Sequence, residues 1–487
     1  MNKIVIVGGG TAGAIASTFV KKYWGDNVDV TLIYDHSKPN IGIGESLTPQ
    51  IYNYLNYVGI TREELIQNVH ATIKLGIKFK NWGISPSEFY HPFTEAPFDG
   101  VSPYNFLASY DIVNAIYDND TCYSKYYFDT NRIPTDRNAV QALHIDGVLF
   151  GKFIIDKFKD EMNIIDGIVE QVIQKENSEE IDHLILRDGT KIHADFFIDA
   201  TGFQAVLFNK LNSKWIDKGD WCPLDRCIPN PVFVDHEVMP VYTTAEASKD
   251  GWILQVPLSN RWGAGYLYSS KFTKDEDAIQ SFSEFLKTTY GTELKSPKII
   301  PFKSGYWERQ WIGNCISVGL ASGFAEPLEA TNIHQLIFQI RQFMDVYNFK
   351  SYEFDANTYN DLMKSFYERV YTFIRFCYSS GRTDSEFWKY MTSTTPREVE
   401  LLTEKIKTDP LNTNSMTRSI FNYENFTKIA YGLNKIDVPS YTTSLNLRHA
   451  YELGKNDSEI VRRHKKDNAT MTMDHTEYIR SLICVKN

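Results

Sequence analysis

The sequence predicts a mixed α/β fold that begins with a parallel, dinucleotide-binding sheet and ends in a mainly helical part. An apolar strand at residues 3–7 runs into the glycine-rich turn Gly8–Gly13 and then into an Ala-rich helix. Short strands at residues 163–201 close on a second loop, Asp199–Phe203, and a third small-residue loop lies within residues 315–334. A chain that returns to its first sheet through such loops is typical of two-dinucleotide-binding flavoproteins rather than of simple nicotinamide dehydrogenases.

Length and composition indicate a globular protein with a large core. The chain has 487 residues, of which 43% are hydrophobic, 23% charged and 14% aromatic. Such a length suffices for one large domain or for two to three ordinary ones. The aromatic share fits a deep apolar pocket, although large cores use aromatic residues too. A formal net charge of −10 argues against a general binder of nucleic acid or of anionic membranes.

The cysteines and the start of the chain predict a cellular location. Six cysteines are scattered, and the closest pair, Cys222 and Cys227, fits no zinc motif, so we expect reduced thiols and no metal site. The chain starts directly in a strand, and no apolar run reaches the length of a membrane span. We therefore expect a soluble, cytoplasmic protein.

The first unit carries a dinucleotide fingerprint. The pattern G-x-G-x-x-G stands between strand and helix and reads Gly8-Gly9-Gly10-Thr11-Ala12-Gly13. A second strand over residues 28–34 is followed by Asp35, about twenty positions beyond the glycines, where the fingerprint places an acid. The glycines allow a pyrophosphate to approach the backbone, and the acid would bind a ribose hydroxyl.

The predicted elements then alternate between loops, strands and helices. A second Gly-rich loop at residues 41–49 precedes a helix at 51–58. Residues 71–82 alternate apolar and polar side chains, which predicts a strand with one buried face and with Lys74 and Lys80 in solvent. An irregular aromatic stretch from about residue 86 to 136 is expected to form a wall or lid of a site.

The later segments are predicted from the same patterns. Residues 139–160 have the pattern of a helix, and residues 231–305 that of sheet strands. After the small-residue loop the chain is expected to be mainly helical, with a loop at 408–414 and a charged end that is low in aromatic residues.

The stretch at residues 315–334 organises the functional prediction. A short buried strand stops at Gly319, and after Asn332 apolar residues recur at helical spacing. Free N–H groups at a helix start, with the helix dipole behind them, favour an anion or an electron-rich cofactor edge. Glu326 and Glu329 lie against this loop, and charge complementarity to a helix start would explain both of them. Taken alone, the stretch predicts an anion- or cofactor-binding loop.

Together these motifs make the chain resemble the flavin-dependent halogenases of the tryptophan halogenase family over roughly residues 1–435. The segments that carry the resemblance are Gly8–Gly13, Gly42–Ser46, Ile77–Phe79, Ala142–Asp146, Gly319–Glu329 and Arg382–Trp388. The resemblance implies a Rossmann-like FAD-binding domain over residues 1–345 with an inserted substrate-facing sheet. A helical substrate-side subdomain over 346–455 and a charged tail over 456–487 would follow.

The resemblance also implies a chemistry. Reduced FAD, supplied by a separate flavin reductase, and oxygen would convert a bound halide (chloride, bromide or iodide) into hypohalous acid. Backbone N–H groups of Thr331 and Asn332 would bind the halide. Lys78 would polarise the hypohalous acid or form a haloamine with it, and Glu329 would orient the reacting group or accept the ring proton. Without the resemblance, Lys78 would be interpreted as a solvated strand lysine.

Cofactor and substrate residues follow in the same way. We expect FAD to contact Gly8, Gly10, Thr11, Ala12, Gly13, Asp35, Gly44, Glu45, Ser46, Gly202 and Gly319. We expect an aromatic clamp on an indole- or phenol-like ring from His91, Phe93 and Trp388. The same three residues would also suit an aromatic core.

Departures from the family pattern bear on the substrate. Leu254 replaces the second Trp of a Trp-x-Trp-x-Ile-Pro motif, and Ala330 replaces the Ser or Thr after the glutamate, which could favour a larger halide. The family residues that hold the amino and carboxylate groups of free tryptophan fall on Phe376, Cys377 and Thr383. Because a buried charge without partners is costly, free tryptophan is disfavoured as the substrate.

Other functions stay open at this level. A flavin-dependent aromatic monooxygenase on the same fold would need FAD and oxygen but neither halide nor Lys78. A non-catalytic FAD-binding protein would bind the cofactor and form no product. Neither nucleic acid nor membrane is an expected partner, and homo-oligomerisation is left open.

Overall fold

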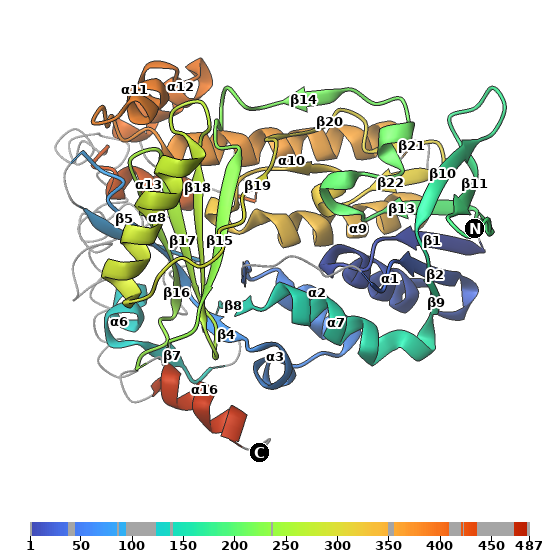
Figure 1. Ribbon diagram of the computed structural model, residues 1–487, viewed down its shortest axis with the longest axis horizontal. Coiled ribbons are helices and arrows are strands. Elements are labelled where there is room, and N and C mark those ends of the chain that lie inside the picture. Colours follow the sequence, from blue (N-terminus) through green and yellow to red (C-terminus); the bar gives the residue numbers. More distant parts are fainter. Residues whose placement is uncertain are drawn as a thin grey trace, which may run out of the picture. The chain divides into compact units, whose positions relative to one another are not determined.

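The computed structural model describes residues 2–37, 44–84, 87–93, 123–136, 140–234, 237–348, 355–408, 420–421, 423–435 and 472–484. The chain forms two compact units, and each draws on three separated segments (Figure 1). Unit 1 comprises Met1–Ala71, Ile145–Asp220 and Phe302–Glu368. Unit 2 comprises Thr72–His144, Trp221–Pro301 and Arg369–Asn487.

A six-stranded sheet forms the centre of unit 1. Five of its strands are parallel, and the sixth, β21 (Trp311–Ile312), pairs antiparallel at one edge. The parallel strands, in spatial order, are β9 (Asn163–Asp166), β2 (Asp29–Tyr34), β1 (Lys3–Val7), β13 (Phe196–Asp199) and β22 (Cys315–Ser317). This order, with β1 in the middle and later strands added on both sides, is that of a dinucleotide-binding sheet, and it confirms the predicted fold class.

The two faces of this sheet are covered differently. Val5, Val7, Ile33 and Phe197 point to one face and pack against β10 (Val169–Gln174), β11 (Ile181–Leu186) and β12 (Lys191–His193). The alternating residues of β1 and β2 are also fully buried and lie on the face next to α1 (Thr11–Trp24). Because both faces are covered, these strands read as continuous apolar runs in the sequence.

The helices of unit 1 begin where the sequence supplies caps. α3 (Arg62–Val69) starts with a capping box of Thr61 and Glu64, and α7 (Gly147–Phe158) is capped by the carboxylate of Asp146. The other long helices are α2 (Ile51–Val58), α9 (Thr331–Asn348) and α10 (Ala356–Cys377), the last of which continues into unit 2. A small sheet of unit 1 contains β14 (Trp215–Asp217), β20 (Gly305–Trp307) and β23 (Gly323–Phe324).

The helix predicted over residues 139–160 is only partly correct. Residues 140 and 141 are not helical, β8 (Ala142–Ile145) is a strand, and α7 begins at Gly147. The strand is wholly buried, so its apolar side chains follow burial on both faces rather than a helical period.

A seven-stranded sheet forms the core of unit 2. Its strands pair antiparallel except for β16 and β5, which run parallel. In spatial order they are β19 (Ile300–Pro301), β15 (Arg226–Val232), β18 (Trp262–Tyr268), β17 (Gly251–Pro257), β16 (Tyr242–Ala247), β5 (Gly76–Lys80) and β6 (Glu88–Pro92). The sheet confirms the strands predicted over residues 231–305.

One helix interrupts that predicted strand region. α8 (Asp275–Tyr290) carries three acidic residues in its first turn and buries Ala278, Phe282 and Leu286 at a spacing of four residues. These side chains pack on strand residues such as Ile228 and Tyr266. The helix was missed because the surrounding alternation of strands dominated the interpretation.

The remaining elements of unit 2 are short. They are β4 (Thr72–Lys74), α6 (Tyr123–Thr130), β7 (Arg132–Pro134), α11 (Glu386–Ser393), α12 (Arg397–Thr408), α13 (Tyr423–Gly432), β24 (Thr472–Asp474) and α16 (His475–Cys484). The stretch predicted to be irregular thus contains β6, α6 and β7, while its residues 94–122 lie outside the described ranges, as do residues 409–414 of the predicted loop.

The glycines of the first turn allow a direct stability test. A Cβ on Gly13 would lie 1.7 Å from the carbonyl oxygen of Gly8, whereas a Cβ on Gly59, which has φ +72°, would meet nothing within 4 Å. We expect Gly13→Ala to lower the free energy of unfolding by roughly 3 kcal/mol or more through overpacking. Gly59→Ala should cost only about 1 kcal/mol, through its left-handed backbone. Urea denaturation measures both, and a Gly13→Ala variant as stable as the parent would contradict the close approach.

Candidate active site

Three loops of unit 1 leave the sheet side by side. Val7, Asp199 and Ser317 are direct neighbours in register on β1, β13 and β22. The loops that follow these residues therefore start at the same level, at the carboxyl ends of adjacent parallel strands. In open α/β sheets this edge is where ligands bind.

The first of these loops is the glycine-rich turn. A Cβ on Gly8, which has φ +122°, would lie 2.3 Å from the carbonyl oxygen of Ala200, and a Cβ on Gly9 would meet the ring of Tyr34 at 2.2 Å. Thr11 opens α1 and donates its hydroxyl proton to the carbonyl oxygen of Gly147 at 2.8 Å. The turn is thus bare backbone ahead of a helix N-terminus, which fits the approach of a phosphate.

The second loop is held by a buried carboxylate. Asp199 is fully buried and accepts hydrogen bonds from the backbone N–H groups of Thr201, Leu207 and Phe208 and from the Thr201 hydroxyl, at 2.6 to 3.0 Å. Burial nevertheless raises the pKa of Asp199. The loop leads into Gly202, whose φ of +66° suits a glycine.

The structure also describes Asp35 and residues 44–46 of the second glycine loop, all of which are predicted to contact FAD. Asp35 follows β2 directly, and its carboxylate accepts from the N–H (2.9 Å) and the hydroxyl (2.6 Å) of Ser37. Glu45 and Ser46 form the short strand β3 (Glu45–Ser46), after Gly44. Burial, and then the neighbouring Asp146 carboxylate, raise the pKa of Glu45. Residues 38–43 lie outside the described ranges.

The third loop is fixed by amides from α9, which the sequence analysis did not single out. Gln339 accepts a hydrogen bond from the Gly319 N–H at 2.8 Å and donates to the Ser322 hydroxyl at 2.7 Å. Gln335, one turn earlier, donates to Ser322 at 3.2 Å and to the hydroxyl of Tyr367. Two glutamines four residues apart on one helix, facing a glycine loop, are the signal that could have indicated this network.

The segment that leads into α9 is strained and contains the predicted acid and halide residues. Pro327–Glu329 form a 3-10 turn, and Ala330 takes the left-handed conformation with φ +57° before α9 begins at Thr331. Glu329 is buried, with 5% of its surface exposed. The side-chain oxygens Thr331 Oγ1 and Asn332 Oδ1 are buried and make no hydrogen bond within the described residues. The N–H groups and the dipole of a helix N-terminus favour a small anion.

In unit 2 the predicted catalytic lysine, Lys78, lies on β5 and is ion-paired. Its ammonium is 2.6 Å from the carboxylate of Glu88, and the two side chains are 16% and 52% exposed. The ammonium also lies 5.5 and 5.8 Å from the ring centres of Tyr90 and Tyr242.

A second lysine contradicts the strand-face prediction. Lys74, expected in solvent, is fully buried on β4, and its ammonium lies 4.8 Å from the centre of the Phe93 ring. The alternation misled the prediction because the chain changes partners at Leu75: β4 pairs with β8, whereas β5 pairs with β6 and β16. Lys80 is partly exposed and pairs with Glu246 at 3.1 Å.

The strand that carries Lys74 is surrounded by neutral, oriented polar groups. Thr72 donates its only hydroxyl proton to the carbonyl oxygen of Pro257 at 2.6 Å, so it accepts from His144 Nδ1 at 2.9 Å. His144 Nε2 then accepts from the Thr243 hydroxyl at 3.0 Å. Burial, and then the nearby Lys74 charge, hold the pKa of His144 well below its usual value, so the ring is neutral.

The predicted aromatic clamp residues are placed as follows. His91 is buried on β6 and its Nε2 lies 3.1 Å from the side-chain amide nitrogen of Asn425, while Phe93 is half-buried beneath Lys74. Trp388 is fully buried on α11 and donates its indole N–H to the carbonyl oxygen of Ser248 at 2.9 Å. That Trp388 stacks on a substrate ring stays a prediction.

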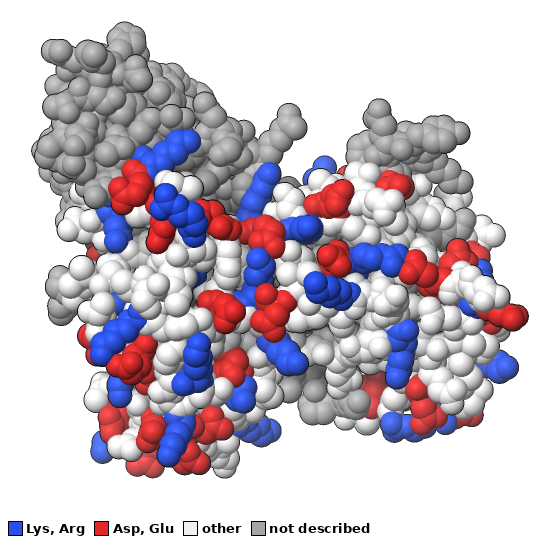
Figure 2. All heavy atoms as spheres, turned by 90° about the horizontal axis from the view of Figure 1, so that it is seen from above, with Lys and Arg blue, Asp and Glu red and all other residues white. Residues whose placement is uncertain are grey.

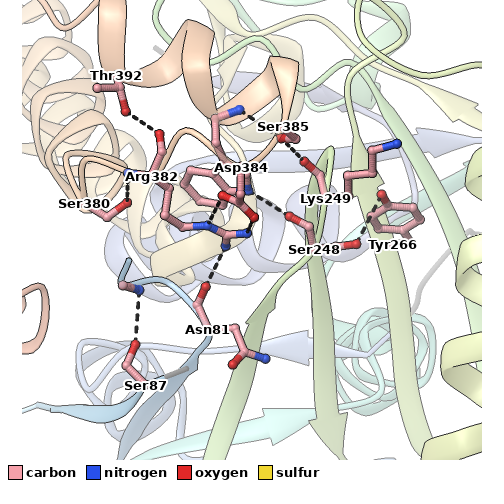
Figure 3. A network of polar contacts seen from close by, with 12 residues as sticks. Asn81, Ser87, Ser248, Lys249, Tyr266, Ser380, Arg382, Asp384, Ser385 and Thr392 are labelled. Carbon is pink, nitrogen blue, oxygen red and sulfur yellow. Dashed lines mark hydrogen bonds and ion pairs between the residues drawn. The ribbon is translucent and has the colours of Figure 1, made fainter. Parts of the chain in front are cut away.

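Arg382, whose contacts with Asp384 and Asn81 are drawn in Figure 3, covers one side of the Trp388 ring. The guanidinium of Arg382 lies 4.2 Å from the centre of the indole ring, donates to both carboxylate oxygens of Asp384 at 2.9 and 2.7 Å, and donates to the Asn81 carbonyl oxygen at 2.6 Å. Ser385 caps α11 and donates to the Lys249 carbonyl oxygen at 2.6 Å. The loop between α10 and α11 is therefore pinned to the sheet of unit 2.

The described surface carries charges of both signs (Figure 2). On the face shown in Figure 2, acidic and basic side chains of the described residues are interspersed, without a basic stripe. No described helix combines the length and the apolarity that a bilayer span requires.

Comparisons with known proteins agree with this geometry. A family model described as Tryptophan halogenase matches residues 3–444. The chain is 30% identical over 418 residues to tryptophan 7-halogenase RebH of Lentzea aerocolonigenes. This match covers 80% of this chain and 78% of RebH. It is 28% identical over 429 residues to tryptophan 6-halogenase SttH of Streptomyces toxytricini, with 80% of each chain covered.

Solved structures extend the match over the whole fold. Xcc4156, a flavin-dependent halogenase from Xanthomonas campestris, matches with a TM-score of 0.88 over 99% of this chain and 98% of its own, at 24% identity. The family model spans nearly the whole sequence, and its members are enzymes of the flavin-dependent halogenase type. The chain therefore belongs to the tryptophan halogenase family.

Proposed function

We propose that the protein is a two-component, FAD-dependent halogenase that transfers an oxidised halide to an electron-rich aromatic substrate other than free tryptophan. The observation that carries this proposal is the fully buried ammonium of Lys74 beside the ring of Phe93. Burying a charged group is costly, so a buried lysine calls for a functional explanation. A donor that polarises the oxygen of hypohalous acid next to an aromatic ring supplies one.

The residues present fit FAD. The carboxyl ends of β1, β13 and β22 bring Gly8, Gly202 and Gly319 to one edge of the sheet, and a side chain on Gly8 would fill the turn. The turn from Gly8 to Gly13 would hold the pyrophosphate, Asp35 a ribose hydroxyl, and residues 44–46 a further edge of the cofactor. When bound in its reduced form, the flavin would supply the two electrons that reduce oxygen to the peroxide level, and oxygen at that level can oxidise the halide to hypohalous acid.

The halide site would be the N-terminus of α9. The backbone N–H groups of Thr331 and Asn332 are free of intrahelical partners by their position, and Ala330 in its left-handed conformation turns the chain there. The Thr331 hydroxyl can donate one more hydrogen bond to the halide, whereas Asn332 Oδ1 is an acceptor and cannot contribute to anion binding. No sulfur-containing or other readily oxidised side chain stands at these positions, as a strong oxidant requires.

The surroundings of the two lysines favour Lys74 for halogen transfer. The resemblance placed halogen transfer on Lys78, but that ammonium is already neutralised by Glu88 at 2.6 Å and is partly exposed. The ammonium of Lys74 is buried beside an aromatic ring, and the adjacent His144 is neutral. We therefore assign the transfer to Lys74, with Lys78 as the alternative from the sequence.

The carboxylate of Glu329 would take the proton that the ring loses. It is buried at the turn before α9, and a carboxylate can act as the general base that accepts the proton of the halogenated ring. The ring loses one proton and gains one halogen atom, while the oxygen of the hypohalous acid leaves as water.

The substrate argument rests on α10 and the loop after it. Phe376 and Cys377 are fully buried, and Phe376 packs on Phe426 at 5.2 Å between ring centres. Neither position offers a partner for an ammonium or a carboxylate. An indole or phenol without an amino acid head, or a much larger aromatic compound, fits better than tryptophan.

Two alternative functions would be distinguished by the products that they form. A flavin-dependent aromatic monooxygenase would give a hydroxylated product without halide, and a non-catalytic FAD-binding protein would give none. A separate flavin reductase is the expected partner, and a cytoplasmic location is consistent with it.

The lysine assignment is tested by paired substitutions. We expect Lys74→Ala to lower the rate of halogenated indole formation at least about 100-fold, because it removes the donor that polarises the oxidised halogen. Lys78→Ala should stay within about threefold of the parent, since it removes only a largely surface ion pair. The assay contains FAD, NADH, a flavin reductase, catalase and bromide, with mass spectrometry of the products. The reverse pattern would return the role to Lys78, and oxygenated product would favour the monooxygenase.

The substrate class is tested by comparing indole with tryptophan. We expect kcat/KM for indole to exceed that for tryptophan at least about tenfold, because Phe376 and Cys377, where the family pattern places partners of the amino acid head, carry no charged group. The same comparison with chloride, bromide and iodide ranks the halides. A preference for tryptophan would show that other residues bind its charged groups.

A further inference from the structure

The C-terminal segment, residues 472–484, lies beyond the part of the chain that matches the family model and is nevertheless built into unit 2. The family match ends at residue 444. The segment consists of β24 and α16, and His475 and Ile479 are fully buried. It therefore contributes to the core of unit 2, although the family model stops before it.

The segment is anchored to β7 by paired backbones and side chains. β24 runs antiparallel to β7, with Met473 opposite Ile133. The guanidinium of Arg132 donates to both the hydroxyl (2.5 Å) and the carbonyl oxygen (2.8 Å) of Thr472. Thr476 accepts from the Asn131 side chain at 3.0 Å.

His475, the first residue of α16, connects this anchor to β4. Its Nε2 lies 3.0 Å from the backbone nitrogen of Ile73, and its Nδ1 lies 2.7 Å from the carbonyl oxygen of Met239. A backbone N–H can only donate and a carbonyl oxygen can only accept, so the ring is neutral with its proton on Nδ1. Burial lowers the pKa of His475 to about 4, which keeps this state at neutral pH.

The contact fixes the strand next to the proposed catalytic lysine. Ile73 precedes Lys74, and its N–H has His475 as its partner rather than a strand of the sheet. The neighbours of Ile73 are held by other groups: Thr72 by Pro257 and His144, and Leu75 by the Val241 carbonyl oxygen. His475 thus supplies the hydrogen bond that completes the fixation of β4.

We infer that the C-terminal segment is a clasp, and that its His475 is a positioning residue that holds β4 so that Lys74 receives the oxidised halogen. The inference rests on the proposed function. A displaced Lys74 leaves oxidation of the halide unchanged and lowers the share of hypohalous acid that reaches the substrate. A shift of about 1 Å at a reacting group can cost on the order of 100-fold.

Two isosteric substitutions separate the two hydrogen bonds. His475→Gln places an oxygen near the position of Nε2 that can accept from Ile73, whereas His475→Asn keeps only a donor for Met239. His36→Gln, which changes an exposed histidine next to Tyr34 in unit 1, is the control. Full-length variants are compared in flavin binding, oxygen consumption and halogenated product, with a soluble trap for released hypohalous acid.

We expect His475→Asn to lower product per halide oxidised at least about tenfold, with more hypohalous acid in the trap and unchanged flavin binding. His475→Gln should stay within about threefold of the parent. In hydrogen exchange measured by mass spectrometry, residues 72–75 should exchange faster in the Asn variant alone. The inference would be overturned if His475→Asn and the parent divided hypohalous acid equally between product and trap and showed equal hydrogen exchange at residues 72–75. It would also be overturned if both variants lost flavin binding and all turnover to the same extent. A parent enzyme that halogenates nothing defeats the proposed function instead, and the exchange comparison then still decides whether His475 holds β4.

A second, independent observation concerns the hairpin of β11 and β12 in unit 1. His183 and His193 are paired directly across the two strands, with ring centres 4.9 Å apart. The register of β11 against β10 shifts between His183 and Ile181, so Asp182 is an extra residue in the strand. This bulge turns Asp182 to the same outer face as His183, as their burial between Ile181 and Leu184 reflects. One donor atom from each of Asp182, His183 and His193 lies within 4.8 Å of the others.

The geometry points to a surface site for a divalent transition metal with two imidazoles and one carboxylate, as zinc prefers. Zinc titration of the full chain against a chromophoric chelator should reveal one site, and His193→Gln should weaken it at least about tenfold. The control is His36→Gln, an exposed histidine next to Tyr34. Equal affinity in all three proteins, or no binding that competes with the chelator, would overturn the assignment.

Discussion

The burial of one ammonium group, that of Lys74, is the constraint on which unit 2 depends. Lys74 has no exposed surface, and a charge in that position is tolerated only where neighbouring dipoles and ring faces are oriented toward it. Phe93 offers a ring face, while His144 and His475 stay neutral because each ring is buried and engaged through both nitrogens. The lysine is therefore the local cation in a polar setting that is already organised. Preorganised donors of this kind are what an electrophilic transfer requires.

Unit 1 has a different feature, which is bare backbone at the sheet edge where the proposed flavin would bind. Its parallel strands end in register, so the three loops after them open on one edge of the sheet. Gly8 and Gly13 allow a contact that any Cβ would block, and the carboxylate of Asp199 holds the second loop through four hydrogen bonds. The turn before α9 stores strain at Ala330, a feature common at functional sites.

Local patterns predicted the parts of the protein that local physics determines. The strand–glycine–helix unit at Gly8–Gly13 and the strand and helix around Gly319 were confirmed, because glycine spacing and apolar period specify them directly. α8 and β8 were missed, since their apolar residues suit either helix or strand until tertiary contacts decide. The burial of Lys74 could not be predicted, because it depends on a change of strand partner at one residue. His475 gave no local signal at all: it meets Ile73 from 402 positions away.

The fate of the oxidised halide in the parent and in Lys74→Ala tests the central claim most directly. Each protein is given FAD, a flavin reductase, oxygen, bromide, indole and a trap for free hypobromous acid, and both products are counted in one reaction. If buried Lys74 delivers the halogen, the parent places bromine on indole at one ring position. The variant should consume oxygen at the parent's rate and send the bromine to the trap. Unchanged yield and ring position in the variant would contradict the account.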